Sequence, residues 1–434
     1  MNKKHILILI IGMTILAGVV YYAIPKKTNT SVAQVSTTVL KKEPVEEISS
    51  SNVPHIKTPN QVKAIYMTSW VSGMKKWREE LVQFINKTEV NALVIDVKDY
   101  SGHISFDTQD SEIKKLGTEQ IRCVDLKEFI EYLHKNNIYV IARITVFQDP
   151  LYSQRVPSQA VQSKKGGVWR DKHGLGYVDP SSRPFWDYIV RLAKACEKVG
   201  FDEINFDYIR FPTDGNMKDM LFPISGPKMA QMPSKQYIQV SQTNIVTLNR
   251  EVSTNGSQLI AGGNPSLNTL VVSPKAILLT EFYRYLHSQM KELPIPISAD
   301  LFGMVLTNTD DLNIGQVLEL AAPCFDYIWP MIYPSHYPPG FKNFSKPAEH
   351  PYEIVNFVLK QGSRRLTLIG QSPNKLRPWL QDFNLGAIYD AGKINAQKKA
   401  VYDAGLNSWF MWDPRNKYTR AGYVTVSKAS TFVQ

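Results

Sequence analysis

The chain has 434 residues, of which 43% are hydrophobic and 21% are charged. This composition is that of a globular protein with a large core, so it excludes a mostly disordered chain and a transporter with many membrane spans. The formal net charge is +11, but no basic run interleaved with aromatic residues is present, and we expect no nucleic-acid partner.

The first 25 residues carry the pattern of a membrane anchor. A short basic head, residues 1–5, is followed by nineteen uncharged residues, 6–24, and a Lys-Lys pair then ends the run. A helix of that length is close to the ~30 Å thickness of the hydrocarbon core. A cleaved secretory signal has a similar head and apolar segment, but bulky Tyr22 stands where its cleavage site prefers a small residue. We predict a single-pass anchor with the folded part outside the cytoplasm, and a secreted protein if the segment is cleaved.

Residues 26–60 form a predicted tether. The segment is rich in Ser, Thr, Lys, Val and Pro and has no period of 2 or 3.6. Such a composition cannot bury enough apolar surface to order itself. We therefore expect a disordered segment that holds the folded part away from the membrane.

From residue 62 onward, short β-branched apolar segments alternate with longer amphipathic segments. This alternation predicts a parallel sheet with helices between its strands. The predicted strands are residues 62–70, 92–99, 139–147, 203–211, 297–303, 325–333, 366–371 and 407–413. The predicted helices are residues 77–89, 126–137, 184–199, 275–293, 312–322, 351–361 and 393–404.

Eight such strands in order predict a (β/α)8 TIM barrel over residues 61–418, followed by a C-terminal tail, residues 419–434. The domain exceeds the typical length of about 250 residues because of two long loops. These are residues 148–183 and an insertion, residues 212–274, with a possible helix near 237–252. A doubly wound sheet is the alternative fold, but the Gly-rich phosphate turn that it needs is absent.

In a barrel of this kind the active site lies at the carboxyl ends of the strands. On the fourth predicted strand, Glu203, Asn205 and Asp207 share the lumen-facing side, since side chains alternate along a strand. Polar residues inside a barrel are costly without partners or a cavity. Arg210, just beyond them, could steady a carboxylate or a sugar hydroxyl. The alternative is a buried polar network that fixes the barrel.

The fifth predicted strand offers a second carboxylate. Ser298 and Asp300 share one face, so that Asp300 could face Asp207, although a helix cap or loop anchor is the alternative role for Asp300. Two opposed carboxylates are what glycoside hydrolysis requires. We predict Asp207 as the nucleophile or base and Asp300 as the general acid.

Other strands supply candidate substrate contacts. Asp96 and Lys98 share a face of the second strand and are interpreted either as an ion pair in the lumen or as the floor of a site. Aromatic rings near strand ends can stack on the flat faces of sugars. The predicted substrate-binding residues are Arg143, Asn205, Arg210, Trp70, Trp329, Tyr333, Trp412 and Asp96.

Other chemistries find little support. The eight histidines show no HxxxH or HxH spacing, and we predict no metal site and no cofactor. Neither a G-x-S-x-G nucleophile motif nor a Walker A sequence is present. The three cysteines form no CxxC pair, which excludes a disulfide framework.

Several blocks of the chain resemble the bacterial putative glycosyl hydrolase domain family. They are residues 62–68, 91–102, 142–150, 167–171, 178–180, 201–212, 298–303 and 326–334. The resemblance implies a TIM barrel distantly related to α-amylase-like hydrolases, often exported and membrane-attached. It implies a nucleophile at Asp207 and an acid at Asp300. Relatives commonly have Glu on the fifth strand and a further Asp on the seventh, where this chain has Asp300 and Gln371.

The leading hypothesis is therefore a glycoside hydrolase, anchored outside the cytoplasm and monomeric, that acts on an envelope or extracellular polysaccharide. The first alternative is a glycan-binding barrel without catalytic activity. The second is a metal-dependent hydrolase that would use Asp96, Asp99 and Asp207 around a divalent ion.

Overall fold

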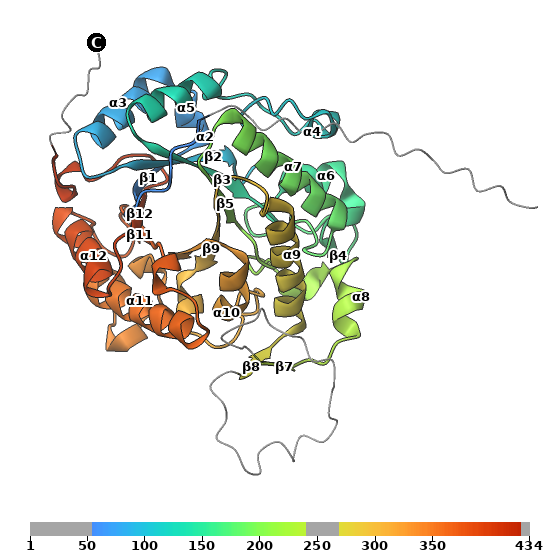
Figure 1. Ribbon diagram of the computed structural model, residues 1–434. Helices are drawn as coiled ribbons and strands as arrows, with labels where there is room; N and C mark the ends of the chain where they lie inside the picture. Colours follow the sequence, from blue (N-terminus) through green and yellow to red (C-terminus); the bar gives the residue numbers. More distant parts are fainter. Residues whose placement is uncertain (1–53, 240–268, 427–434) are drawn as a thin grey trace, which may run out of the picture. The chain divides into compact units, whose positions relative to one another are not determined.

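The computed structural model describes residues 54–239 and 269–426 (Figure 1). The predicted anchor, residues 1–25, lies outside this range, as do most of the predicted tether and the end of the C-terminal tail. Within the described ranges, no helix is both long enough and apolar enough to span a membrane.

Eight parallel strands close into a barrel, which confirms the predicted (β/α)8 architecture (Figure 1). Around the barrel each strand pairs with its neighbours in chain order, and the last strand pairs with the first. The strands are β1 (Lys63–Met67), β2 (Ala92–Lys98), β3 (Tyr139–Thr145), β5 (Glu203–Asp207), β9 (Ile297–Phe302), β10 (Tyr327–Met331), β11 (Trp379–Gln381) and β12 (Trp409–Trp412).

Helices surround the strands in Figure 1. The long ones are α3 (Lys75–Asn86), α5 (Leu126–Lys135), α7 (Arg183–Val199), α9 (Pro274–Met290), α11 (Pro351–Leu368) and α12 (Ala391–Asp403). Local chemistry fixes their ends, as α7 illustrates. The Ser182 hydroxyl accepts a hydrogen bond from the Phe185 amide, and Pro184 occupies the first turn. Gly200 ends the helix with a φ of 118°, a conformation that glycine adopts without steric cost.

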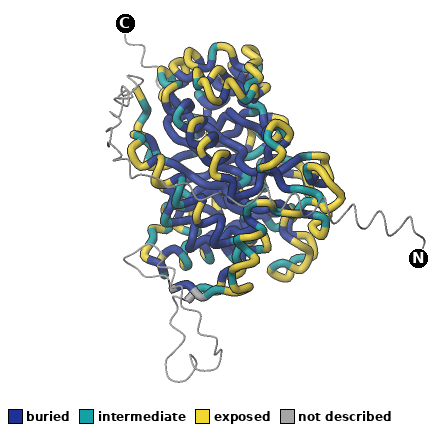
Figure 2. Tube along the Cα trace, turned by 90° about the vertical axis from the view of Figure 1, so that its right-hand side faces the viewer, coloured by how far each residue is buried: buried dark blue, intermediate teal, exposed yellow. Residues whose placement is uncertain are grey.

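Side chains on each strand alternate between the lumen and the helix layer. Aromatic and aliphatic residues fill the lumen, among them Ala64, Tyr66, Ile141, Trp329, Trp379 and Phe410. The opposite faces of the strands join the larger core under the helices, as Ile65, Ile95 and Met411 do. Figure 2 shows the buried chain running through the interior of this domain. The lumen is therefore a packed core, and a site can form only at its ends.

The seventh strand was predicted in the wrong place. Residues 366–368 are the end of α11, and β11 is the three-residue strand Trp379–Gln381. Leu366 continues the buried stripe that Val355, Val358 and Leu359 form on this helix, so an apolar run typical of a strand is the last turn of a helix. A three-residue strand is too short for a period of 2 to be recognised.

Two other predicted elements are shorter than expected. The fourth strand stops at Asp207 rather than at residue 211, because Tyr208 has a φ of 52°, which a strand cannot accommodate. The predicted helix at 312–322 shrinks to α10 (Leu318–Ala321), since Leu312 and Asn313 also have positive φ angles.

The two long loops pack on each other. β4 (Gln162–Ser163) from the first loop pairs antiparallel with β6 (Met220–Leu221) from the insertion. Farther along, β7 (Gln236–Gln239) pairs antiparallel with β8 (Thr269–Val272). The helix predicted near 237–252 is therefore wrong at its start, and the rest of it lies outside the described residues.

Residues 54–60 form an ordered segment, which we call the basal strap, so the predicted disorder is wrong for this end of the tether. The Ile56 amide donates to Asp202 Oδ1 at 2.7 Å, and the His55 ring lies 3.3 Å from Glu197. The Thr58 hydroxyl lies 3.1 Å from the hydroxyl of Tyr139. These contacts fix the strap at the amino ends of β3 and β5.

The first part of the predicted C-terminal tail is also packed on the barrel. The Tyr423 hydroxyl donates to Asp382 at 2.7 Å, and Lys398 of α12 donates to the Gly422 carbonyl at 2.6 Å. A β-bridge joins Thr425 to Thr88. The folded domain thus extends to at least residue 425.

His55 of the basal strap makes the free energy of unfolding of the domain depend on pH. The Asp202 carboxylate, which lies 3.8 Å from His55 Nδ1, raises the pKa of His55 above its ordinary value of 6.5, against the effect of burial and with help from Glu197. A raised histidine pKa adds stability that is complete below 6.5 and is lost as the pH rises through the folded pKa. We expect His55→Gln to lower the free energy of unfolding at pH about 6 more than at pH about 8, in chemical denaturation. His173→Gln on an exposed loop is the control, and a pH-independent difference would contradict the prediction.

Candidate active site

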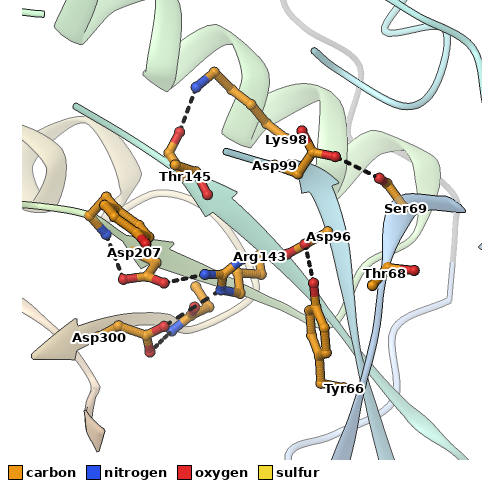
Figure 3. Close-up of polar contacts among 12 residues, drawn as sticks. Tyr66, Thr68, Ser69, Asp96, Lys98, Asp99, Arg143, Thr145, Asp207 and Asp300 are labelled. Carbon is orange, nitrogen blue, oxygen red and sulfur yellow. Dashed lines mark hydrogen bonds and ion pairs between the residues drawn. The ribbon is translucent and has the colours of Figure 1, made fainter. Parts of the chain in front are cut away.

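Four strands bring polar side chains together around the guanidinium of Arg143. Nη1 donates to Asp96 Oδ1 at 2.5 Å, and Nη2 pairs with Asp207 Oδ2. Nε lies 3.7 Å from Asp300 Oδ2. Figure 3 shows Arg143 between Asp96 on one side and Asp207 and Asp300 on the other. One buried cation thus links the carboxyl ends of β2, β3, β5 and β9.

Asp207 accepts a donor at each oxygen. Besides Arg143 at Oδ2, the backbone amide of Tyr208 donates to Oδ1 at 2.5 Å. The positive φ of Tyr208 turns this amide back toward the preceding carboxylate, and such strained residues cluster at functional sites. Only the ionised form of a carboxyl group accepts at both oxygens without also donating. The arrangement therefore suits Asp207 to act as a nucleophile or base.

Asp300 has the opposite environment. Its Oδ1 accepts from Asn205 Nδ2 and from Trp379 Nε1, each at 3.0 Å. Its Oδ2 is buried and has no hydrogen-bond partner within the described residues. Burial and the charge of Asp207 raise the pKa of Asp300 well above its ordinary value, although Arg143 acts against them. Asp300 is thus suited to carry a proton and to donate it from Oδ2.

Asp96 accepts a hydrogen bond from the Arg143 guanidinium on the side opposite Asp207 and Asp300. The Tyr66 hydroxyl donates to Asp96 Oδ2, and the Tyr66 ring stacks on Trp412 with 3.9 Å between centroids. Trp412 also lies under Arg143, whose Cζ is 5.0 Å from its ring centroid. Burial raises the pKa of Asp96, against the charge of Arg143. Asp96 therefore orients Arg143 and does not face the site as a free carboxylate.

The structure brings Asp96, Arg143, Asn205, Asp207 and Asp300 together, as the sequence predicted. Tyr333 packs in the same lumen cluster as Tyr66 and Trp412, and burial together with the charges of Asp300 and Asp207 raises the pKa of its phenol well above the ordinary value. Trp412 is partly exposed beside Arg143.

Three predicted contacts have other surroundings. Trp329 is fully buried and stacks on Phe410 at 3.8 Å between centroids, so it is a core residue of the lumen and not a sugar platform. Arg210 pairs with Asp214 at 2.6 Å and contacts neither Asp207 nor Asp300. Trp70 lies exposed on the short helix α2 (Ser69–Ser72), outside the cluster around Arg143.

Asp96 and Lys98 do not form the predicted ion pair. The pairing of β2 with β3 shifts register between them, and Lys98 pairs with Asp149 at 2.9 Å. Both of these side chains are fully buried. Glu203 lies deeper in the lumen, where Arg377 and Tyr139 bind it at 3.1 and 2.9 Å. Glu203 is therefore part of a buried polar network that fixes the barrel and not part of the site.

A metal centre finds no support in this arrangement. Among residues 54–239 and 269–426, no three His, Cys, Asp or Glu side chains meet as a metal site requires. Arg143 already occupies the space between Asp96 and Asp207, and Asp99 is bound by Arg122 and Ser101.

Sequence reasoning missed Tyr66, Tyr208 and Trp379. Tyr66 falls within a predicted strand, and its lumen-facing parity was a usable signal. Trp379 could not be found, because its strand was placed about ten residues too early. Nothing in the sequence marks the backbone conformation of Tyr208.

Comparison with known proteins points to carbohydrate chemistry. The sequence model of the family described as "Putative glycosyl hydrolase domain" matches residues 64–418. No curated protein matches the chain significantly.

Two of the solved structures similar to this chain share its fold, with TM-scores above 0.5. The glycoside hydrolase domain of PgaB (BpsB) from Bordetella bronchiseptica is 13% identical, with a TM-score of 0.52 over 81% of this chain and 93% of that one. The α-L-fucosidase isoenzyme 2 of Paenibacillus thiaminolyticus is 12% identical, with a TM-score of 0.52 over 83% of this chain and 48% of that one. A hypothetical protein from Ruminiclostridium thermocellum is 28% identical, with a TM-score of 0.41 over 54% of this chain and 96% of that one.

The coupling between the two carboxyl groups can be measured directly. In Asp207→Asn we expect the pKa of Asp300 to fall, because a repelling charge is lost while Arg143 remains. Titration of labelled aspartate carboxyl carbons by NMR would report it. Asp382→Asn is the control, since burial raises the pKa of Asp382 to about 6 but its partners, Thr419 and Tyr423, lie outside the lumen. A pKa of Asp300 that stays constant or rises in Asp207→Asn would show that the two groups are not coupled.

Proposed function

Because the chain belongs to the putative glycosyl hydrolase domain family, we propose that it cleaves a glycosidic bond with Asp207 and Asp300. The observation that carries this proposal is the contrast between two carboxyl groups on either side of one guanidinium. Asp207 accepts one donor at each oxygen, whereas Asp300 has a raised pKa and accepts both of its donors at Oδ1, which leaves Oδ2 without a hydrogen bond among the described residues. Pairs of carboxyls whose environments separate their protonation states mark an acid and its partner.

In the proposed reaction Asp300 Oδ2 donates its proton to the glycosidic oxygen as the bond to the anomeric carbon breaks. Asp207 either attacks that carbon or takes a proton from the attacking water. The charge that develops on the sugar ring is positive, and an ionised carboxylate stabilises it. Both roles are needed in the transition state and not for binding.

The surrounding residues act through these two groups. Arg143 orients Asp207, and Asn205 and Trp379 hold Asp300 Oδ1 so that Oδ2 stays free to donate. Trp412, which lies beside Arg143, and Tyr333, which packs in the same lumen cluster, would contact the sugar. Arg210, which pairs with Asp214, would hold the loop that follows β5.

A glycan-binding protein without activity is the second candidate, and a specific observation favours it. Asp207 and Asp300 are only 3% and 1% exposed, and Arg143 pairs with Asp207 directly. A substrate must displace or widen this arrangement before either carboxyl can react.

We also propose that the domain works outside the cytoplasm, on an envelope or extracellular glycan. The support is the basic head and the uncharged run of residues 6–24. If the segment is retained as an anchor, mass spectrometry of the membrane fraction should find the intact N-terminus. A mature chain that starts near residue 33 and is recovered from the medium would contradict the anchor and indicate a cleaved signal.

The catalytic assignment predicts two different losses of activity. Asp207→Asn should lower kcat by several orders of magnitude while glycan affinity stays nearly unchanged. Asp300→Asn should lower it by ~10²–10⁴-fold on a natural glycan, since a positioned acid contributes that much. The loss should be smaller on an activated aryl glycoside, whose leaving group needs little protonation.

Steady-state kinetics on an oligosaccharide and on nitrophenyl glycosides would measure these losses. Asp403→Asn is the control, because it alters an exposed carboxyl group at the end of α12, away from the site. A wild type that binds glycan without turnover would favour the binding protein. A rate that survives Asp207→Asn would refute the assignment.

A further inference from the structure

Two large aromatic side chains lie exposed beside the mouth of the barrel. Trp70 on α2 follows the carboxyl end of β1, and Tyr100 follows the carboxyl end of β2. They are 57% and 60% exposed. The preceding residues tie the two segments together, because the Ser69 hydroxyl donates to Asp99 Oδ2 at 2.9 Å (Figure 3).

Trp70 is held by a buried cation. The Cζ atom of Arg122 lies 4.3 Å from the centroid of the indole ring of Trp70. The side chain of Arg122 is only 5% exposed. Because the guanidinium covers one face of the ring, the exposed surface of Trp70 belongs to the other face and the edge. An Arg–Trp contact of this kind stabilises the ring in one orientation.

Arg122 is itself fixed from several sides. It pairs with Asp99, donates to the Ser69 hydroxyl at 2.5 Å, and donates to Gln120 at 2.7 Å. The backbone carbonyl of Arg122 lies close to Gly73, which ends α2. A Cβ atom at residue 73 would stand 2.0 Å from the carbonyl oxygen of Arg122, so only glycine fits at this position. The exposed Trp70 is thus part of a rigid, built surface.

This surface is separate from the catalytic pair. In Figure 3, Ser69 and Asp99 lie on the far side of Asp96 and Arg143 from Asp300. Around the barrel, β3 lies between β2 and β5, which carries Asp207. A ligand that reaches both places must therefore extend across the mouth.

We propose that Trp70 and Tyr100 form a subsite that stacks a sugar ring of a polymeric glycan, away from the bond that is cleaved. Preoriented aromatic faces pack against the apolar C–H faces of pyranose rings with little loss of conformational freedom. The subsite gives the enzyme its preference for polymers over short glycosides. The inference rests on the proposed function for its substrate class, but its binding step does not require turnover.

Affinity electrophoresis of the full chain tests the binding step. The probes are gels that contain glycol chitin, soluble starch or carboxymethyl cellulose. We expect retardation in at least one of them, and roughly tenfold weaker binding for Trp70→Ala, as the loss of one central aromatic contact gives. Trp70→Phe should restore part of the binding, because a stacking face remains. Tyr132→Ala removes an exposed aromatic residue on the outer helix α5 and should bind as the wild type does.

The same measurement on Asp207→Asn separates the two proposals. Retardation that persists in Asp207→Asn but is lost in Trp70→Ala supports the subsite even if no catalysis is found. In an active enzyme, Trp70→Ala should lower kcat/KM on the retained polymer and leave kcat/KM on an aryl monosaccharide unchanged. Equal retardation of Trp70→Ala and wild type would overturn the subsite. So would the absence of retardation in every gel, or self-association that Trp70→Ala abolishes without any effect on glycan binding.

Discussion

The site is organised by the buried contact between Arg143 and three carboxyl groups, Asp96, Asp207 and Asp300. A single positive charge cannot offset three negative charges in a space from which water is excluded. The carboxyl group whose charge the guanidinium compensates least is the one favoured to take up a proton. That group is Asp300, because the nearest guanidinium nitrogen is 3.7 Å away and its Oδ2 has no hydrogen-bond partner among the described residues. The charge imbalance in the barrel lumen thus favours the neutral form of Asp300 beside Asp207, which accepts a donor at each oxygen.

Aromatic packing around Arg143 strengthens the electrostatic interactions among Arg143 and the three carboxyl groups. Tyr66, Trp379 and Trp412 contact one another and exclude water from the guanidinium. Electrostatic interactions are stronger where the effective dielectric constant is low. The same aromatic packing leaves little exposed surface at the centre of the mouth. The exposed rings of the rim, Trp70 and Tyr100, are where we propose that the rest of a long glycan binds.

At the opposite end of the barrel, the basal strap, residues 54–60, packs against the amino ends of two strands. Asp202 accepts hydrogen bonds from the strap at Ile56 and from the Val140 amide, at 2.7 and 2.8 Å. Glu203 and Arg377 pair in the lumen above it. These contacts fix the amino ends of β3 and β5, the two strands that carry Arg143 and Asp207. The geometry of the site thus depends on order at both ends of the barrel.

The sequence by itself determined the barrel, the shared face of Glu203, Asn205 and Asp207 on one strand, and the shared face of Ser298 and Asp300 on the next, because alternation along a strand is a local property with a period of 2. It could not place β11, whose three residues show no period, and so it missed Trp379. It could not show that Lys98 pairs with Asp149 rather than with Asp96, because the register shift between Asp96 and Lys98 depends on the neighbouring strand. It also could not distinguish the buried Trp329 from the exposed Trp70. Which aromatic ring meets solvent is decided by depth in the closed barrel, and only the tertiary structure sets that depth.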